Sequence, residues 1–282
     1  MRNGHKIEQP QADEPLDSKV NKWHLPLIAA IAIIARIIYD INLSTDIFLN
    51  SYHLDSLVLH SWALDILSGT TANLAFFRAP FYPYLLALLY KLFSISPWPV
   101  IIFQNLLGVL TALMSYKYAR FLFGSRVAFW SGIVVAIYPT LLIFEGETMI
   151  TTLEVFLYTL SIYLMHLAVE RLDSRRIVIA GIVLGLAAIT RPIILPLAII
   201  FPIALLAKLG KKNYTPIISK SVIFGLAAMI PILPVALRNI IEGYEFVLIS
   251  TQGGANFYIG NCKDADGITV VALGPQLRGG GI

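Results

Sequence analysis

Long apolar runs dominate this chain, and short polar segments separate them. Apolar residues cover most faces of these runs, so periodicity alone does not say which of them cross a bilayer. A crossing helix needs about 20 such residues. The pattern predicts an all-α, polytopic membrane helical bundle. Eight runs stand out, at residues 23–39, 81–95, 100–115, 127–144, 153–169, 177–189, 193–207 and 222–237.

The basic residues between the runs indicate which runs cross. Lys and Arg collect on the cytoplasmic side of membrane proteins. All four basic segments share one side only if either 81–95 or 100–115 does not cross. The 81–95 run has 15 residues, follows Pro80 and contains Pro83 near its start. We therefore expect about seven spans, with 81–95 as a juxtamembrane or re-entrant helix. Fourteen Lys and Arg lie in four segments, 1–22, 117–126, 171–176 and 208–220, and the segments between them hold six.

This topology divides the chain into three parts. Residues 1–22 are polar and are expected to form a disordered cytoplasmic tail. Residues 23–240 form the transmembrane core, with a first outer loop at 43–99, and residues 241–282 form an extracytoplasmic tail. The protein is expected in the cell membrane, with a cytoplasmic N-terminus.

Composition supports the membrane assignment. Hydrophobic residues make up 57% of the 282 residues and charged residues only 13%, against about 25% charged residues in soluble domains. The net charge of +4 therefore concerns orientation and contact with membrane lipids, and we expect no nucleic-acid partner. Cys262 is the only cysteine, which excludes an internal disulfide and a thiolate zinc cluster.

The predicted topology places the notable polar residues at one face of the membrane. Reactive groups gathered there favour chemistry on a lipid headgroup, whereas a transporter is expected to carry ionisable residues near the bilayer midplane. Arg36, inside the first run, is an exception, and its i,i+4 spacing predicts a pair with Asp40. The residues on this outer side include Asp55, His60, Asp65, Arg78, Glu145, Glu147, Arg191, Gly253, Gly254, Asn256 and Tyr258.

Several motifs over about 36–267 resemble the GT-C type membrane glycosyltransferases, in the branch that contains protein O-mannosyltransferases and the aminoarabinose transferase of lipid A. The motifs are Asp55-Ser56-x-x-x-His60-x-Trp62-Ala63, Phe77-Arg78-Ala79-Pro80-Phe81-Tyr82-Pro83-Tyr84, Gln104-x-x-x-Gly108, Tyr138-Pro139, Gly181-x-x-x-Gly185 with Thr190-Arg191-Pro192, and Gly253-Gly254-x-Asn256-x-Tyr258-x-Gly260-Asn261.

The resemblance implies an enzyme that transfers a sugar from a polyprenyl-phosphate donor to a protein, lipid or glycan acceptor at the outer face. Asp55 matches the aspartate that serves as catalytic base. Relatives commonly continue beyond the point where this sequence stops, at Ile282, so the chain resembles a truncated member. A transporter or flippase and an inactive remnant are the alternative interpretations.

The chemistry supports these residue types. A base must take the proton of the incoming hydroxyl, and a cation must stabilise the departing phosphate. In an inverting displacement these groups flank the sugar, so Asp55 and Arg78 are expected about one sugar-ring width apart. Asp55 could instead be a helix N-cap. Arg78 and Arg191 could bind the donor phosphate or a phospholipid headgroup.

Each of the other candidates has more than one interpretation. Glu145 and Glu147 could orient the acceptor, hold a divalent cation or be solvated loop acids. No other cofactor is expected. His60 follows His53 by seven residues, which places both on one helix face, but no well-placed third ligand accompanies them. His60 therefore suits packing or acceptor contact better than a metal site. Gly253, Gly254, Asn256 and Tyr258 could line a pocket or form a structural turn.

Overall fold

The computed structural model describes residues 22–47, 49, 51–243, 246–262 and 265. These residues contain helices and no strand. The expected tail 1–22 lies outside the described residues except for Lys22. The elements are α1 (His24–Leu43), α2 (Leu54–Ser68), α3 (Phe81–Leu92), α4 (Pro97–Phe123), α5 (Ser125–Ala136), α6 (Pro139–Glu145), α7 (Thr151–Arg171), α8 (Ser174–Thr190), the 3-10 helix η1 (Pro192–Ile194), α9 (Leu197–Leu209), α10 (Tyr214–Gly243) and α11 (Gln252–Asn261).

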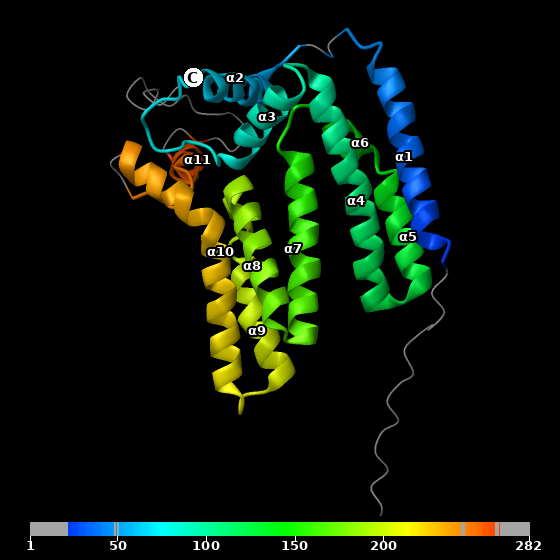
Figure 1. Cartoon of the computed structure of the whole chain (residues 1–282), viewed down its shortest axis with the longest axis vertical. Coiled ribbons are helices and arrows are strands. Elements are labelled where there is room, and N and C mark those ends of the chain that lie inside the picture. The colour runs from blue at the N-terminus through cyan, green and yellow to red at the C-terminus, as the bar shows by residue number, and fades with distance from the viewer. Residues whose placement is uncertain (1–21, 48, 50, 244–245, 263–264, 266–282) are drawn as a thin grey trace, which may run out of the picture.

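The long helices form two groups that stand side by side (Figure 1). In the first group, α1 packs on α4 and α5, and α6 packs on α4; the second group contains α7, α8, α9 and α10. Contacts between α4 and α7 join the groups. Each group has a buried apolar cluster, with Ile28 and Tyr116 in the first and Phe201 and Phe224 in the second.

The fold confirms the all-α membrane bundle. Among the described residues, five helical segments are long and apolar enough to cross a membrane: α1, α4, α7, Pro192–Leu209 and α10. The pair α5 and α6 adds a sixth if its 46° bend lies within one span. Pro139 starts α6 and explains the break, because proline does not continue a preceding helix. The seventh expected span corresponds to α8, whose 17 residues are at the short limit for a crossing.

The two ends of the bundle differ. The loops from α1 to α4, from α6 to α7 and from α8 to α9, and the segment after α10, lie at the end that carries α2, α3 and α11 (top of Figure 1), here called the α2–α3 end. Three of the predicted basic segments, 117–126, 171–176 and 208–220, lie at the opposite end, and the fourth, 1–22, is outside the described residues except for Lys22. With only 12 residues, α3 is too short to cross, as the sequence predicted for 81–95.

Glycines on α8 allow a close approach to α10. A Cβ added at Gly181 would lie 2.5 Å from the Phe224 carbonyl oxygen, and one at Gly185 would lie 2.9 Å from Pro231 Cδ. Small residues spaced by four positions let two helix backbones meet in this way. The Gly181-x-x-x-Gly185 motif therefore has a packing role, which positions the α8 end that carries Arg191.

Candidate functional site

An ion pair at the α2–α3 end joins the two residues with the strongest expected roles. Arg78 Nη2 lies 2.9 Å from Asp55 Oδ1, and the two side chains are 27% and 55% exposed. Asp55 is in the first turn of α2, and Arg78 precedes α3. The expected separation by a sugar ring is therefore not present, because the two opposite charges are in direct contact.

The N-cap interpretation of Asp55 is wrong. His53 is the N-cap of α2, and Ser56 completes a capping box, with the His53 backbone N–H donating to Ser56 Oγ at 2.9 Å. This leaves the Asp55 carboxylate to pair with Arg78. Leu54, between the cap and Asp55, has a φ of 47°, in the left-handed region that is strained for a leucine.

His60 belongs to an aromatic cluster. Its ring stacks on Tyr52 with 3.9 Å between centroids, and Nδ1 lies 2.8 Å from the Tyr90 hydroxyl. Burial lowers the pKa of His60 and raises the pKa of Tyr90. At neutral pH Tyr90 therefore stays protonated, and its hydroxyl can donate a hydrogen bond to a neutral His60. This arrangement supports the packing interpretation and leaves the acceptor role as a prediction.

The end of α10 holds the segment that leads to Arg78. Arg238 donates to the carbonyl oxygens of Ala72 and Leu74 and lies over the Phe76 ring, 4.0 Å from its centroid. Asn239 Oδ1 accepts from the Phe76 backbone N–H at 2.9 Å. The path of the chain up to Arg78 is therefore set by residues about 160 positions further on.

The start of α11 lies against the same segment. The backbone N–H groups of Thr251 and Gln252 donate to the carbonyl oxygens of Phe76 and Phe77, at 3.0 and 2.9 Å. Four of the predicted pocket residues follow in α11 and are exposed; they are Gly253, Gly254, Asn256 and Tyr258. The structure therefore brings the tail next to Arg78, as part of a helix, and the pocket role stays a prediction.

Arg191 has a different partner from Arg78. It follows α8 and its Nη1 lies 2.6 Å from Glu154 Oε2, with the side chains 55% and 12% exposed. Tyr158 donates to the Arg191 carbonyl oxygen at 3.2 Å. Arg191 is thus fixed at the α2–α3 end by α7, with half of its side chain open to a ligand.

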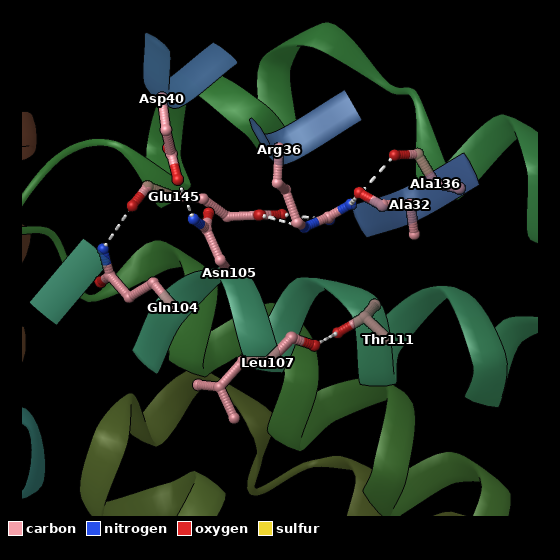
Figure 2. A network of polar contacts seen from close by, with 9 residues as sticks. All are labelled: Ala32, Arg36, Asp40, Gln104, Asn105, Leu107, Thr111, Ala136 and Glu145. Atoms are coloured by element: carbon pink, nitrogen blue, oxygen red, sulfur yellow. Dashed lines mark hydrogen bonds and ion pairs between the residues drawn. The ribbon is translucent and has the colours of Figure 1, made fainter. Parts of the chain in front are cut away.

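A second ion pair is buried between the helices of the first group (Figure 2). Arg36 on α1 contacts Glu145 on α6 through two contacts of 2.7 Å, Nε to Oε2 and Nη2 to Oε1, and both residues are almost fully buried. Nη1 also donates to the carbonyl oxygens of Ala32 and Ala136. The predicted Arg36–Asp40 pair is therefore wrong: Asp40 accepts from Asn105 instead, at 2.7 Å. A bidentate carboxylate satisfies the planar guanidinium better than a neighbour on the same helix does.

The motif Gln104-x-x-x-Gly108 on α4 has a structural explanation. Gln104 Nε2 donates to the backbone oxygens of Glu145 and Glu147, at 2.9 and 2.7 Å. Gly108 faces the buried pair, and a Cβ there would overlap with both Glu145 Oε1 and Arg36 Nη2. Glu145 is thus buried while the Glu147 side chain is exposed, so Glu147 is the better placed of the two for contact with an acceptor.

Replacing Gly108 with alanine is expected to destabilise the protein by about 1–3 kcal/mol, because the added methyl group must displace a buried ion pair. The thermal unfolding midpoint of the purified protein in detergent measures this. Gly225→Ala is the matched control, since a Cβ at Gly225 meets nothing within 4 Å and alanine favours the helix. Equal midpoints for the two variants would contradict the packing around Gly108.

Among the described residues, no group of three or more His, Cys, Asp and Glu side chains could hold a metal ion. The possible divalent cation at Glu145 and Glu147 therefore has no observation in support.

Sequence reasoning missed four residues of this end. Glu154 contacts Arg191, and Tyr90 contacts His60. Arg238 and Asn239 contact the 72–76 segment. One signal was available, because Glu154 is an acid within a predicted span, where ionisable residues usually have a function. Nothing in the sequence pairs Asn239 with Phe76.

A multi-pass helical membrane protein with a polar site at one end of its bundle is the class that these features define. The chain matches the family model of the dolichyl-phosphate-mannose-protein mannosyltransferases over residues 78–236, more than half of its length. It belongs to this family and is therefore a membrane glycosyltransferase of the mannosyltransferase type.

The matched range begins at Arg78 and includes Glu145, Glu147 and Arg191, whereas Asp55 and the residues of α11 lie outside it. No curated protein and no solved structure matches the chain.

Proposed function

We propose that this glycosyltransferase transfers a sugar, with inversion, from a polyprenyl-phosphate donor to an acceptor hydroxyl at the α2–α3 end. The contact between Asp55 and Arg78 carries the proposal, since it places an exposed carboxylate within 2.9 Å of a half-buried guanidinium. Arg191, at the same end, supplies a second contact for the donor phosphate.

The step balances with these two residues. The acceptor oxygen forms a bond to the anomeric carbon, and the bond from that carbon to the phosphate oxygen breaks. The electron pair stays on the phosphate, whose developing charge Arg78 stabilises. Asp55 accepts the proton of the hydroxyl as general base. The products are the glycosylated acceptor and the polyprenyl phosphate.

The direct ion pair requires an exchange of partners before the reaction. A guanidinium has five N–H donors, and Asp55 contacts one terminal nitrogen of Arg78. A donor phosphate can therefore bind the remaining N–H groups and then replace the carboxylate. This exchange leaves Asp55 free to accept a proton and inserts the sugar between the two groups, at the separation that inversion requires.

The charge distribution supports an extracytoplasmic site in the cell membrane. Ten Lys and Arg lie in 117–126, 171–176 and 208–220, the described segments at the bundle end opposite to α2 and α3 (Figure 1), and such segments usually stay in the cytoplasm. The acceptor, a protein, a lipid or a glycan, then approaches from outside, where Glu147, His60 and α11 lie.

The test uses purified protein in liposomes with a radiolabelled polyprenyl-phosphate mannose and a hydroxyl acceptor. Arg78→Ala is expected to raise the KM for the donor about 10- to 100-fold, because a hydrogen bond to a charged group contributes about 1.5–3 kcal/mol. Arg175→Ala, at the opposite end, is the control. Movement of the labelled lipid across the bilayer without any glycosidic bond formed would instead identify a flippase.

A further inference from the structure

Two buried side-chain amides form hydrogen bonds with the segment that carries Arg78, one before Arg78 and one after it. Asn239 on α10 accepts from the Phe76 backbone N–H, two residues before Arg78. Gln104 on α4 accepts from the hydroxyl of Tyr82, four residues after Arg78, at 3.0 Å. Both amides are fully buried, at 0% exposure.

The nitrogen of each amide also donates two hydrogen bonds. Asn239 Nδ2 donates to the carbonyl oxygens of Val247 and Ile249, both at 3.1 Å. Gln104 Nε2 donates to the backbone oxygens of Glu145 and Glu147. Both N–H donors and the oxygen of each side chain are thus in use, and a fully satisfied buried network of this kind is rigid.

The anchors come from different parts of the bundle. Asn239 ties the 76–78 segment to the last long helix and to the loop residues 247–249. Gln104 bonds both to Tyr82 and to the backbone of Glu145 at the end of α6; Figure 2 shows the contact with Glu145. The two helix groups therefore meet at the Arg78 segment. A fixed backbone is what a guanidinium needs if it is to meet a phosphate in one geometry.

Resting on the proposed function, we propose that Asn239 and Gln104 are positioning residues that hold Arg78 in place for the donor phosphate. Neither side chain contacts the substrate. Each acts through the backbone or a neighbour of Arg78, so the effect of replacing it must depend on the presence of Arg78.

The experiment measures binding of a polyprenyl monophosphate to the purified full-length chain in detergent, with unphosphorylated polyprenol for comparison. Asn239→Leu and Gln104→Met are each expected to weaken phosphate-lipid binding about tenfold or more, because small misplacements of a binding group are costly. In the Arg78→Ala background, the same replacements should cause almost no further loss. Asn105→Leu is the matched control, since this neighbouring amide bonds to Asp40.

Hydrogen exchange of the same variants provides a second readout that needs no ligand. Asn239→Leu is expected to raise deuterium uptake in peptides that cover 70–82, and Asn105→Leu is not. Equal losses of binding with and without Arg78, or unchanged uptake in 70–82, would overturn the positioning role. If the wild type binds polyprenol as tightly as the phosphate, the proposed phosphate site fails, and hydrogen exchange alone then decides whether the amides hold this segment.

Discussion

Replacing Asp55 with asparagine is expected to lower kcat for sugar transfer by about 10²–10⁴-fold, the usual contribution of a positioned general base. The amide keeps the size of the side chain but cannot accept the proton of the acceptor hydroxyl. The loss is measured as initial rates of transfer from a polyprenyl-phosphate mannose in liposomes.

The same variant allows a second prediction, which distinguishes the role of Asp55 from that of Arg78. In the proposed exchange of partners, Asp55 competes with the donor phosphate for Arg78, because the two side chains are in direct contact. Removing its charge is therefore expected to leave the donor KM unchanged or lower, whereas Arg78→Ala raises it. A donor KM that rises for Arg78→Ala but not for Asp55→Asn would be difficult to explain by unfolding.

Asp65→Asn serves as the control for Asp55. Asp65 lies on the same helix and is exposed, and its carboxylate accepts a long hydrogen bond of 3.4 Å from Thr70. We expect wild-type rates for this variant. If Asp55→Asn retained more than about half of the wild-type kcat, the assignment of Asp55 as general base would fail.

Removing one partner of the buried Arg36–Glu145 pair is expected to destabilise the protein by about 3–5 kcal/mol. Arg36→Met leaves a carboxylate and Glu145→Met leaves a guanidinium without its counter-charge, in a position that is nearly closed to solvent. Unfolding in detergent, followed by circular dichroism against denaturant, measures the loss.

The double variant Arg36→Met/Glu145→Met supplies the decisive comparison. An apolar pair of similar volume carries no uncompensated charge, so most of the stability lost in the single variants is expected to return. If the two single losses simply added, the residues would not be coupled and the pair would not hold α6 against α1. Arg176→Ala is a control, because its pair with Asp173 is exposed and contributes little.

The position of α6 matters for the site as well as for stability. Glu145 ends α6 and begins the loop that carries Glu147, and Gln104 fixes both backbone oxygens. A single variant at Arg36 is thus expected to disturb the loop with Glu147, on the proposed acceptor side of the site, even under conditions in which the protein remains folded.

What the sequence determined by itself rests on composition and on the order of apolar runs. The length of each run is a local property, so the bundle, the short α3 and the family were predictable without any contact between distant residues. The motif with Arg78 was recognisable for the same reason, because the residues around it are consecutive.

Only the tertiary structure decided the partners. Helical spacing suggested Asp40 for Arg36, but the buried guanidinium selects Glu145, which is 109 positions away and reaches it past Gly108. The sequence left Asp55 as either a helix cap or a base. In the fold, His53 is the N-cap of α2 and the Asp55 carboxylate pairs with Arg78. Side chains choose among all groups that packing brings within reach, and charge, burial and hydrogen-bond geometry then determine which contact forms.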